Sequence, residues 1–207
     1  MLKKLDKLVS ESVNKFLLRE FYSAPLYHAT CLGSAWKILL HGSISASIDG
    51  DGCCDSRIGN RPFVALARSL DSEYVKKTYP NTVIFVVDPQ RLMNGSIKNA
   101  RLLPFDFMDN NYEEWQRREL IRKSGQPLKA VSESEMEERF YGDIPINYVT
   151  SVIIKIKNLS QMDYRSDIDS LDAESDEYDL DTDFGRNLFL LNSIQELCKK
   201  HGIKLIK

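Results

Sequence analysis

The stretch SESEMEERFYGDIP, residues 132–145, sets four glutamates beside one arginine and ends in a glycine and a proline that break regular structure. If it is an extended strand, its side chains alternate between two faces, so every second residue shares a face. This interpretation groups Glu135, Glu137 and Arg139 on one face, and Met136, Glu138 and Phe140 on the other. Carboxylates this close repel one another unless a cation or a ribose hydroxyl separates them, so the stretch is a candidate for chemistry. The alternative is a solvated acidic turn of helix.

The composition is that of a globular chain. Its 207 residues are 43% hydrophobic and 28% charged, which suffices for one domain, alone or with an appendage. No apolar run reaches the length of a membrane span, and the start MLKKLDKLVSESV lacks the apolar region of a signal peptide. The cysteines have no CxxC spacing and no paired histidines, which predicts free thiols, a cytoplasmic location and no metal site; they are Cys31, Cys53, Cys54 and Cys198.

The formal net charge of -2 hides an uneven distribution. Residues 163–183 hold ten acidic residues and one basic residue, and the rest of the chain holds 27 basic against 20 acidic residues. We expect an acidic, flexible surface segment over residues 161–186. The mildly basic remainder suits an anionic ligand such as a dinucleotide or a nucleic acid.

The order of predicted elements favours an α+β fold. Residues 1–24 have apolar side chains at helical spacing, which predicts an amphipathic helix packed on a domain of residues 25–160, to which residues 187–207 return. Apolar runs predict strands at residues 26–30, 63–67, 82–87, 148–157 and 203–206. Helical patterns cover residues 35–40 (ended by Gly42), 111–123 and 187–200, whereas Pro104 excludes a regular interior strand from residues 97–108. These elements do not alternate regularly, which argues against a doubly wound sheet.

Three of these fragments resemble the ADP-ribosyltransferase superfamily. They are Tyr27-His28-Ala29-Thr30, followed by a helix; Val64-Ala65-Leu66-Ala67-Arg68-Ser69; and Glu135-x-Glu137-Glu138-Arg139, leading to Ile144-Pro145. The resemblance covers residues 26–157. It is closest to the His-containing branch, which is diphtheria-toxin-like and poly-ADP-ribose-polymerase-like, and to phage-borne or DNA-targeting relatives. It implies split antiparallel β-sheets flanked by helices, with NAD as the substrate held between the sheets.

The resemblance also implies roles in binding NAD. His28 matches the histidine that bonds the adenosine ribose, the backbone of Ala29 faces the nicotinamide amide, and Thr30 supports the strand end. Arg68 meets the pyrophosphate, because a guanidinium suits phosphate oxygens, and Tyr74 stacks on the nicotinamide.

Three positions depart from the family pattern. Ala29 replaces the usual glycine and adds a methyl group where the ligand approaches. The middle motif has Ala65 and Ala67 in place of serine and threonine.

The glutamate stretch supplies the catalytic candidates. Glu137 matches the invariant glutamate of the family, Glu135 is the upstream residue facing the acceptor, and Glu138 is the competing assignment. Cleavage of the nicotinamide bond develops positive charge on the ribose, as in glycoside hydrolysis, and a fixed carboxylate stabilises that charge. A second carboxylate can act as base for the incoming nucleophile. Arg139 is alternatively a structural ion-pair partner of these acids.

Three functions remain open. The first is an NAD-dependent ADP-ribosyltransferase, phage- or bacterium-encoded and toxin-like, that modifies a protein or nucleic acid and acts in the cytoplasm or a host cytoplasm. The second is a non-enzymatic module that retains the fold for binding a macromolecular partner, as Ala65 and Ala67 suggest. The third is an NAD glycohydrolase with water as the acceptor.

Overall fold

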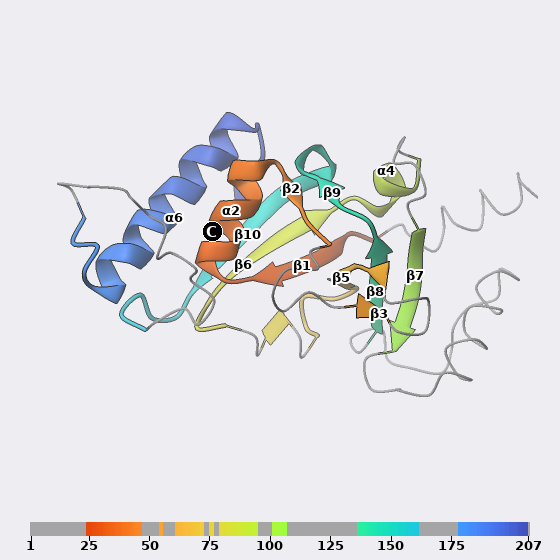
Figure 1. Cartoon of the computed structure of the whole chain (residues 1–207), viewed down its shortest axis with the longest axis horizontal. Helices are drawn as coiled ribbons and strands as arrows, with labels where there is room; N and C mark the ends of the chain where they lie inside the picture. The colour runs from red at the N-terminus through yellow and green to blue at the C-terminus, as the bar shows by residue number, and fades with distance from the viewer. Residues whose placement is uncertain are drawn as a thin grey trace, which may run out of the picture.

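A seven-stranded sheet forms the centre of the protein, in the order β11-β10-β6-β1-β5-β8-β7 (Figure 1). The computed structural model describes residues 24–46, 54–55, 61–72, 75–76, 79–94, 101–106, 136–161 and 178–206, with the backbone alone at 54–55, 61, 93–94, 101–106 and 136–137. The strands are β1 (Leu26–Thr30), β5 (Val64–Ala67), β6 (Asn81–Val87), β7 (Arg101–Asp106), β8 (Met136–Tyr141), β10 (Val149–Ile156) and β11 (Lys204–Ile206). Neighbours pair antiparallel, except that β11 runs parallel to β10.

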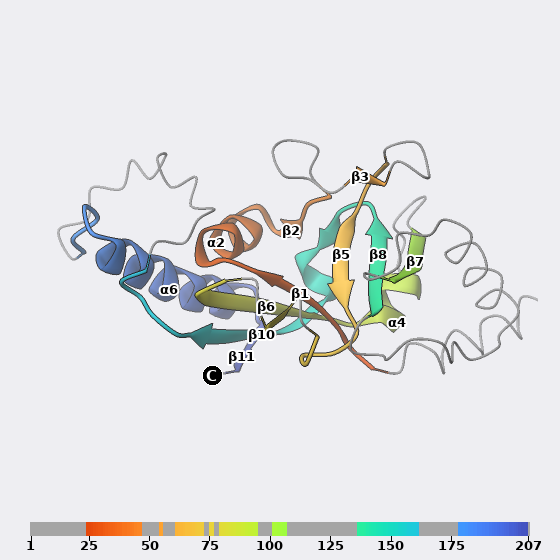
Figure 2. The ribbon, with the colours of Figure 1, turned by 90° about the horizontal axis from the view of Figure 1, so that it is seen from below.

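The sheet is split into two parts, which we call wings. The larger wing contains β11, β10, β6 and β1, and the smaller wing contains β5, β8 and β7. Strands β1 and β6 pair over five residues, and β5 and β8 over four, but β1 meets β5 in register only at Tyr27 and Ala67. Figure 2 shows the consequence: β5 and β8 run across the direction of β1, β6 and β10. The predicted α+β class with split antiparallel strands is therefore confirmed, with β11 as a parallel addition.

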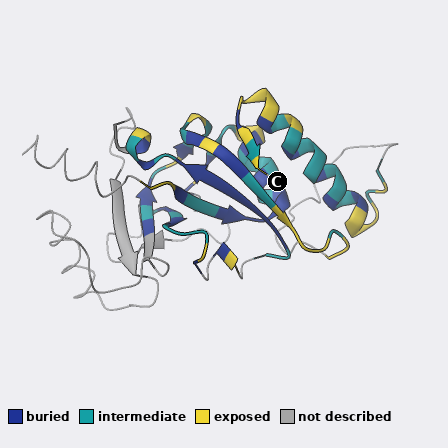
Figure 3. Ribbon diagram, turned by 180° about the vertical axis from the view of Figure 1, so that it is seen from behind, coloured by how far each residue is buried: buried dark blue, intermediate teal, exposed yellow. Residues whose placement is uncertain are grey.

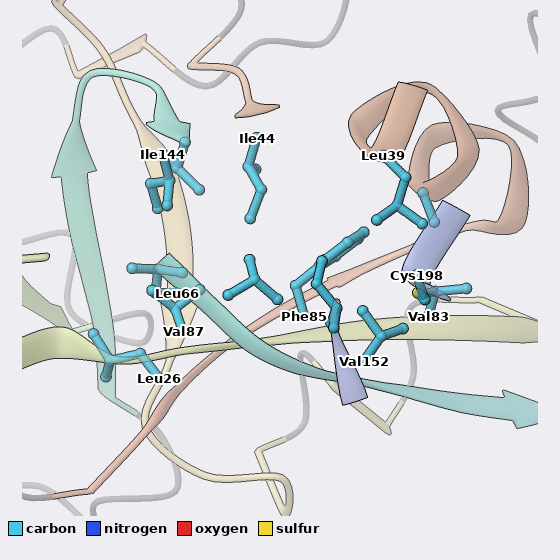
Figure 4. Close-up of a cluster of buried hydrophobic side chains, with 14 of the residues drawn as sticks. Leu26, Leu39, Ile44, Leu66, Val83, Phe85, Val87, Ile144, Val152 and Cys198 are labelled. Carbon is cyan, nitrogen blue, oxygen red and sulfur yellow. The ribbon is translucent and has the colours of Figure 1, made fainter. Parts of the chain in front are cut away.

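Helices α2 (Leu32–His41) and α6 (Asp183–Lys200) cover one face of the larger wing (Figure 2). Their apolar side chains join those of the sheet in the main core, where Leu39 and Cys198 lie beside Phe85 and Val152 (Figure 4). Every residue of β6 is buried, as its continuous apolar run predicts for a central strand, and Figure 3 shows the buried strands beneath the partly exposed α6.

The described residues also include two short strand pairs, a short helix and a 3-10 turn. Strand β2 (Ser43–Ile44) pairs with β9 (Ile144–Pro145), and β3 (Cys54–Asp55) pairs with β4 (Arg61–Pro62). Helix α4 (Pro89–Asn94) follows β6, and a 3-10 turn (Ile146–Tyr148) precedes β10. The β2–β9 pair places Ile44 and Ile144 in the main core (Figure 4).

The helix predicted at residues 35–40 has the expected end and an earlier start. Gly42 caps α2 in the left-handed conformation, with φ of 76°. The helix begins at Leu32 because Cys31 is the N-cap, its Sγ accepting the backbone N–H of Ser34 at 3.4 Å. A buried thiol at this position agrees with the free cysteine expected from the sequence.

Helix α6 begins at Asp183, four residues before the predicted start, so the end of the predicted acidic segment is helical. Thr182 is the N-cap, its Oγ1 accepting the backbone N–H of Gly185 at 3.1 Å, and Asp183 lies in the first turn, where a negative charge suits the helix dipole. Gly185 is required here, since a Cβ atom would lie 1.9 Å from the backbone oxygen of Asp179.

Strand β7 contains Pro104, in a segment that the sequence predicts to be extended or irregular and not a regular interior strand. It forms because β7 is the edge of the sheet, where a missing backbone N–H costs no ladder bond.

Several predictions lie outside the described residues: the N-terminal helix of residues 1–23, the basic helix of residues 111–123 and most of the acidic segment. Among the described helices, none is both long and apolar enough to cross a membrane.

Candidate functional site

His28 lies in the middle of β1, next to the other wing. Its imidazole is half-buried and its Nδ1 lies 3.0 Å from the carbonyl oxygen of Ala65 on β5. A carbonyl oxygen only accepts, so Nδ1 carries the hydrogen and the neutral ring keeps its acceptor lone pair on Nε2. Burial lowers the pKa of His28, and this effect exceeds the opposing effect of the Ala65 hydrogen bond. At neutral pH the ring therefore presents an acceptor, which suits a hydroxyl donor.

Glu138 shares a sheet face with His28. His28 pairs in register with Phe85 on one side, and the Tyr27–Ala67 pair brings Leu66 next to it on the other side. Leu66 in turn pairs with Glu138 on β8. With about 4.8 Å between neighbouring strands, the backbones at His28 and Glu138 are about 10 Å apart. Residues 28 and 138 are separated widely in sequence, and the sheet register alone brings them together.

Arg68 forms an ion pair with Glu138. The Nε of Arg68 donates to Oε1 of Glu138 at 2.8 Å, and Nη2 donates to the same oxygen. The Glu138 side chain is fully buried, whereas 14% of the Arg68 side chain remains exposed. A buried carboxylate needs such a partner, because desolvation of an isolated charge is costly. The exposed surface of this ion pair therefore belongs to Arg68.

Two further predicted binding residues, Ala29 and Thr30, lie on β1. Ala29 is buried with Ala67, Val75 and Ile84 in a second apolar cluster, on the face of the sheet opposite His28. Its methyl group therefore points away from the imidazole, and the contact of its backbone with the nicotinamide amide stays a prediction. Thr30 is buried at the end of β1, opposite Val83.

The other two candidate glutamates are Glu137 and Glu135. Glu137 occupies β8 opposite Ala67 and Phe105, and its side chain lies outside the described residues. Glu135 and Tyr74 also lie outside them, so their predicted roles stay predictions. In the part of the chain that is described, no group of three His, Cys, Asp or Glu side chains is arranged to hold a metal ion.

Sequence reasoning missed the pairing of Arg68 with Glu138. The alternation of β8 correctly grouped Glu138 with Phe140, and Phe140 is buried in the main core. That apolar neighbour is the signal that could have marked Glu138 as the inward-facing glutamate. Arg139 faces the other way, with its guanidinium carbon 4.1 Å from the centre of the Phe63 ring.

No protein-family model and no curated protein matches this chain. Three solved structures of DarT from Thermus sp. 2.9 are similar. The complex with NAD+ is 11% identical, covers 88% of this chain and 93% of its own, and has a TM-score of 0.46. The complex with carba-NAD+ is 11% identical (88% and 94% covered, TM-score 0.47), and the complex with ADP-ribosylated ssDNA is 12% identical (88% and 92% covered, TM-score 0.44). TM-scores this low do not identify the residues of a site, so the candidate site is defined by the contacts within this chain alone.

Proposed function

We propose that this chain is an NAD-dependent ADP-ribosyltransferase that transfers ADP-ribose to a macromolecular acceptor. The observation that supports it most is the placement of His28 and Glu138 on one face of three adjacent strands, with Arg68 bonded to Glu138. These residues come from the three fragments that resemble the superfamily. Their backbone separation, about 10 Å, suits groups that hold separate parts of one dinucleotide.

Each side chain has a distinct role in the proposed reaction. Nε2 of His28 accepts a hydrogen bond from a hydroxyl of the adenosine ribose, and Arg68 bonds the pyrophosphate. Glu138 grips a hydroxyl of the nicotinamide ribose and stabilises the positive charge that develops when the glycosidic bond breaks. The bonding electrons stay on the nicotinamide nitrogen, so nicotinamide leaves neutral, and the acceptor bonds the ribose carbon after giving its proton to a base. Glu135 remains the proposed base.

Glu138 is preferred over Glu137 as the catalytic carboxylate. Its position on β8 shares the face of His28, and in the free protein its carboxylate is bonded to Arg68. Glu137 stays the alternative, and the two residues are separable by substitution.

A non-enzymatic binding module is the second candidate. It is favoured by the full burial of Glu138, which a structural ion pair with Arg68 explains equally well. Ala65 and Ala67, which stand where the family has serine and threonine, argue less strongly for a binding module than the sequence implies. Ala67 packs in the apolar cluster on the face opposite His28, so its methyl group removes no polar group from the His28 side.

Incubation with labelled NAD tests the proposal. The protein is presented with single-stranded DNA, duplex DNA, RNA and a cell extract, beside Glu138→Gln, Glu137→Gln and, as a matched control on exposed α6, Glu196→Gln. We expect transfer by the wild type and by Glu196→Gln, and a loss of about 100-fold or more in Glu138→Gln. Free ADP-ribose without labelled acceptor would indicate the glycohydrolase instead. Equal labelling by wild type and Glu138→Gln, or no binding of NAD, would reject the enzymatic role of this site.

A further inference from the structure

The guanidinium of Arg68 is needed in two places. In the structure it neutralises Glu138, donating through Nε and Nη2 to one carboxylate oxygen. In the proposed function, on which this inference rests, it bonds the pyrophosphate of NAD. Both partners are anions that use the same fork of N–H donors, so they compete for it.

The position of Arg68 suits a change of partner. It is the first residue after β5, where the chain bends away from the sheet, and it reaches back to Glu138, which lies opposite Leu66. Glu138 is fully buried and Arg68 keeps 14% of its side chain exposed. An anion that enters from solvent can therefore reach the exposed part of Arg68, whereas the carboxylate of Glu138 is not accessible to it.

We propose that Arg68 is an exchangeable partner, held by Glu138 in the free protein and transferred to a nucleotide diphosphate on binding. The exchange releases Glu138 from its ion pair at the moment when the ribose arrives, so that the carboxylate turns to the ribose hydroxyl. Without ligand, Arg68 compensates the buried charge, which would otherwise oppose an incoming anion.

The exchange makes an unusual prediction for binding. If the diphosphate has to displace Glu138, removal of that carboxylate strengthens diphosphate binding, although the same change abolishes catalysis. The amide of Glu138→Gln bonds a guanidinium more weakly than a carboxylate does, because bonds between charged groups are the stronger ones. We expect ADP to bind about tenfold more tightly to Glu138→Gln than to the wild type.

Calorimetric titration with ADP at fixed ionic strength tests this expectation. Glu196→Gln, which makes the same charge change on exposed α6, is the matched control and keeps the wild-type affinity. Arg68→Gln weakens ADP binding, and in Arg68→Gln/Glu138→Gln the gain from Glu138→Gln disappears. Arg91→Gln, on exposed α4, controls for loss of an arginine.

A second measurement uses the wild type, in case Glu138→Gln does not fold. The NMR signal of the Arg68 Nε–H group, assigned by its absence in Arg68→Gln, is followed as ADP is added, and we expect it to shift as its acceptor changes. If that signal stays in place, or if Glu138→Gln and wild type bind ADP within twofold of each other while Arg68→Gln binds weakly, the exchange is refuted and the site stands. If ADP and NAD bind neither the wild type nor any of the variants, the proposed function fails together with the exchange.

Discussion

Substitution of Arg68 by methionine tests the buried ion pair through stability rather than activity. The change leaves the fully buried Glu138 carboxylate without its guanidinium partner, and methionine keeps most of the length of the side chain. Loss of one partner of a buried pair costs about 3–5 kcal/mol, against about 0–1 kcal/mol for an exposed pair. Because 14% of the Arg68 side chain is exposed, we expect the lower end, about 3 kcal/mol.

Urea unfolding at pH 7, followed by circular dichroism, measures this loss, and thermal unfolding should show a decrease of about 6–12 °C. The double substitution Arg68→Met/Glu138→Leu removes both charges and should regain most of the lost stability, with a coupling free energy of at least about 1.5 kcal/mol. A loss below about 1 kcal/mol in Arg68→Met, or effects that simply add in the double variant, would refute the buried ion pair.

Three further predictions concern other parts of the structure. Burial lowers the pKa of His28 in the folded protein. The stability that depends on the neutral imidazole is therefore complete above the pKa of the unfolded chain, about 6.5, and is lost as the pH falls below that value. Between pH 7.5 and 5.5 the wild type should lose more free energy of unfolding than His28→Gln. Gly185→Ala should destabilise by more than about 2 kcal/mol, despite the better helix propensity of alanine, because its Cβ meets the backbone of Asp179, whereas the neighbouring exposed Phe184→Ala should have little effect in the same urea titration. Thr182→Ala removes the N-cap of α6 and should cost about 1 kcal/mol, with Thr182→Ser restoring it.

The sequence predicts the local elements well where a residue type has one dominant role. Gly42 ends α2 because the left-handed conformation favours glycine, and the apolar run of β6 is buried throughout because β6 lies inside the sheet. The predicted start of α6, residue 187, is wrong because the N-cap Thr182 lies within residues 163–183, whose acidic composition predicts a flexible segment. Pro104 was interpreted correctly as unfit for an interior strand, but only the sheet order shows that its segment is an edge strand.

The candidate site was harder to predict because it depends on register between distant strands. Alternation along β8 separates Glu138 from Arg139, but it does not tell which face looks toward His28. That choice follows from the pairs Tyr27–Ala67 and Leu66–Glu138, which join segments 40 and 72 residues apart. The ion pair of Arg68 with Glu138 follows from the same register, and no local pattern in the sequence encodes it.

A crystal structure of Glu138→Gln with NAD bound tests the central claim most directly. The account predicts one dinucleotide between the wings, with a hydroxyl of the adenosine ribose bonded to Nε2 of His28, the pyrophosphate on Arg68 and the nicotinamide ribose beside position 138. An NAD molecule that contacts position 137 but not 138, or that binds away from His28, would contradict it.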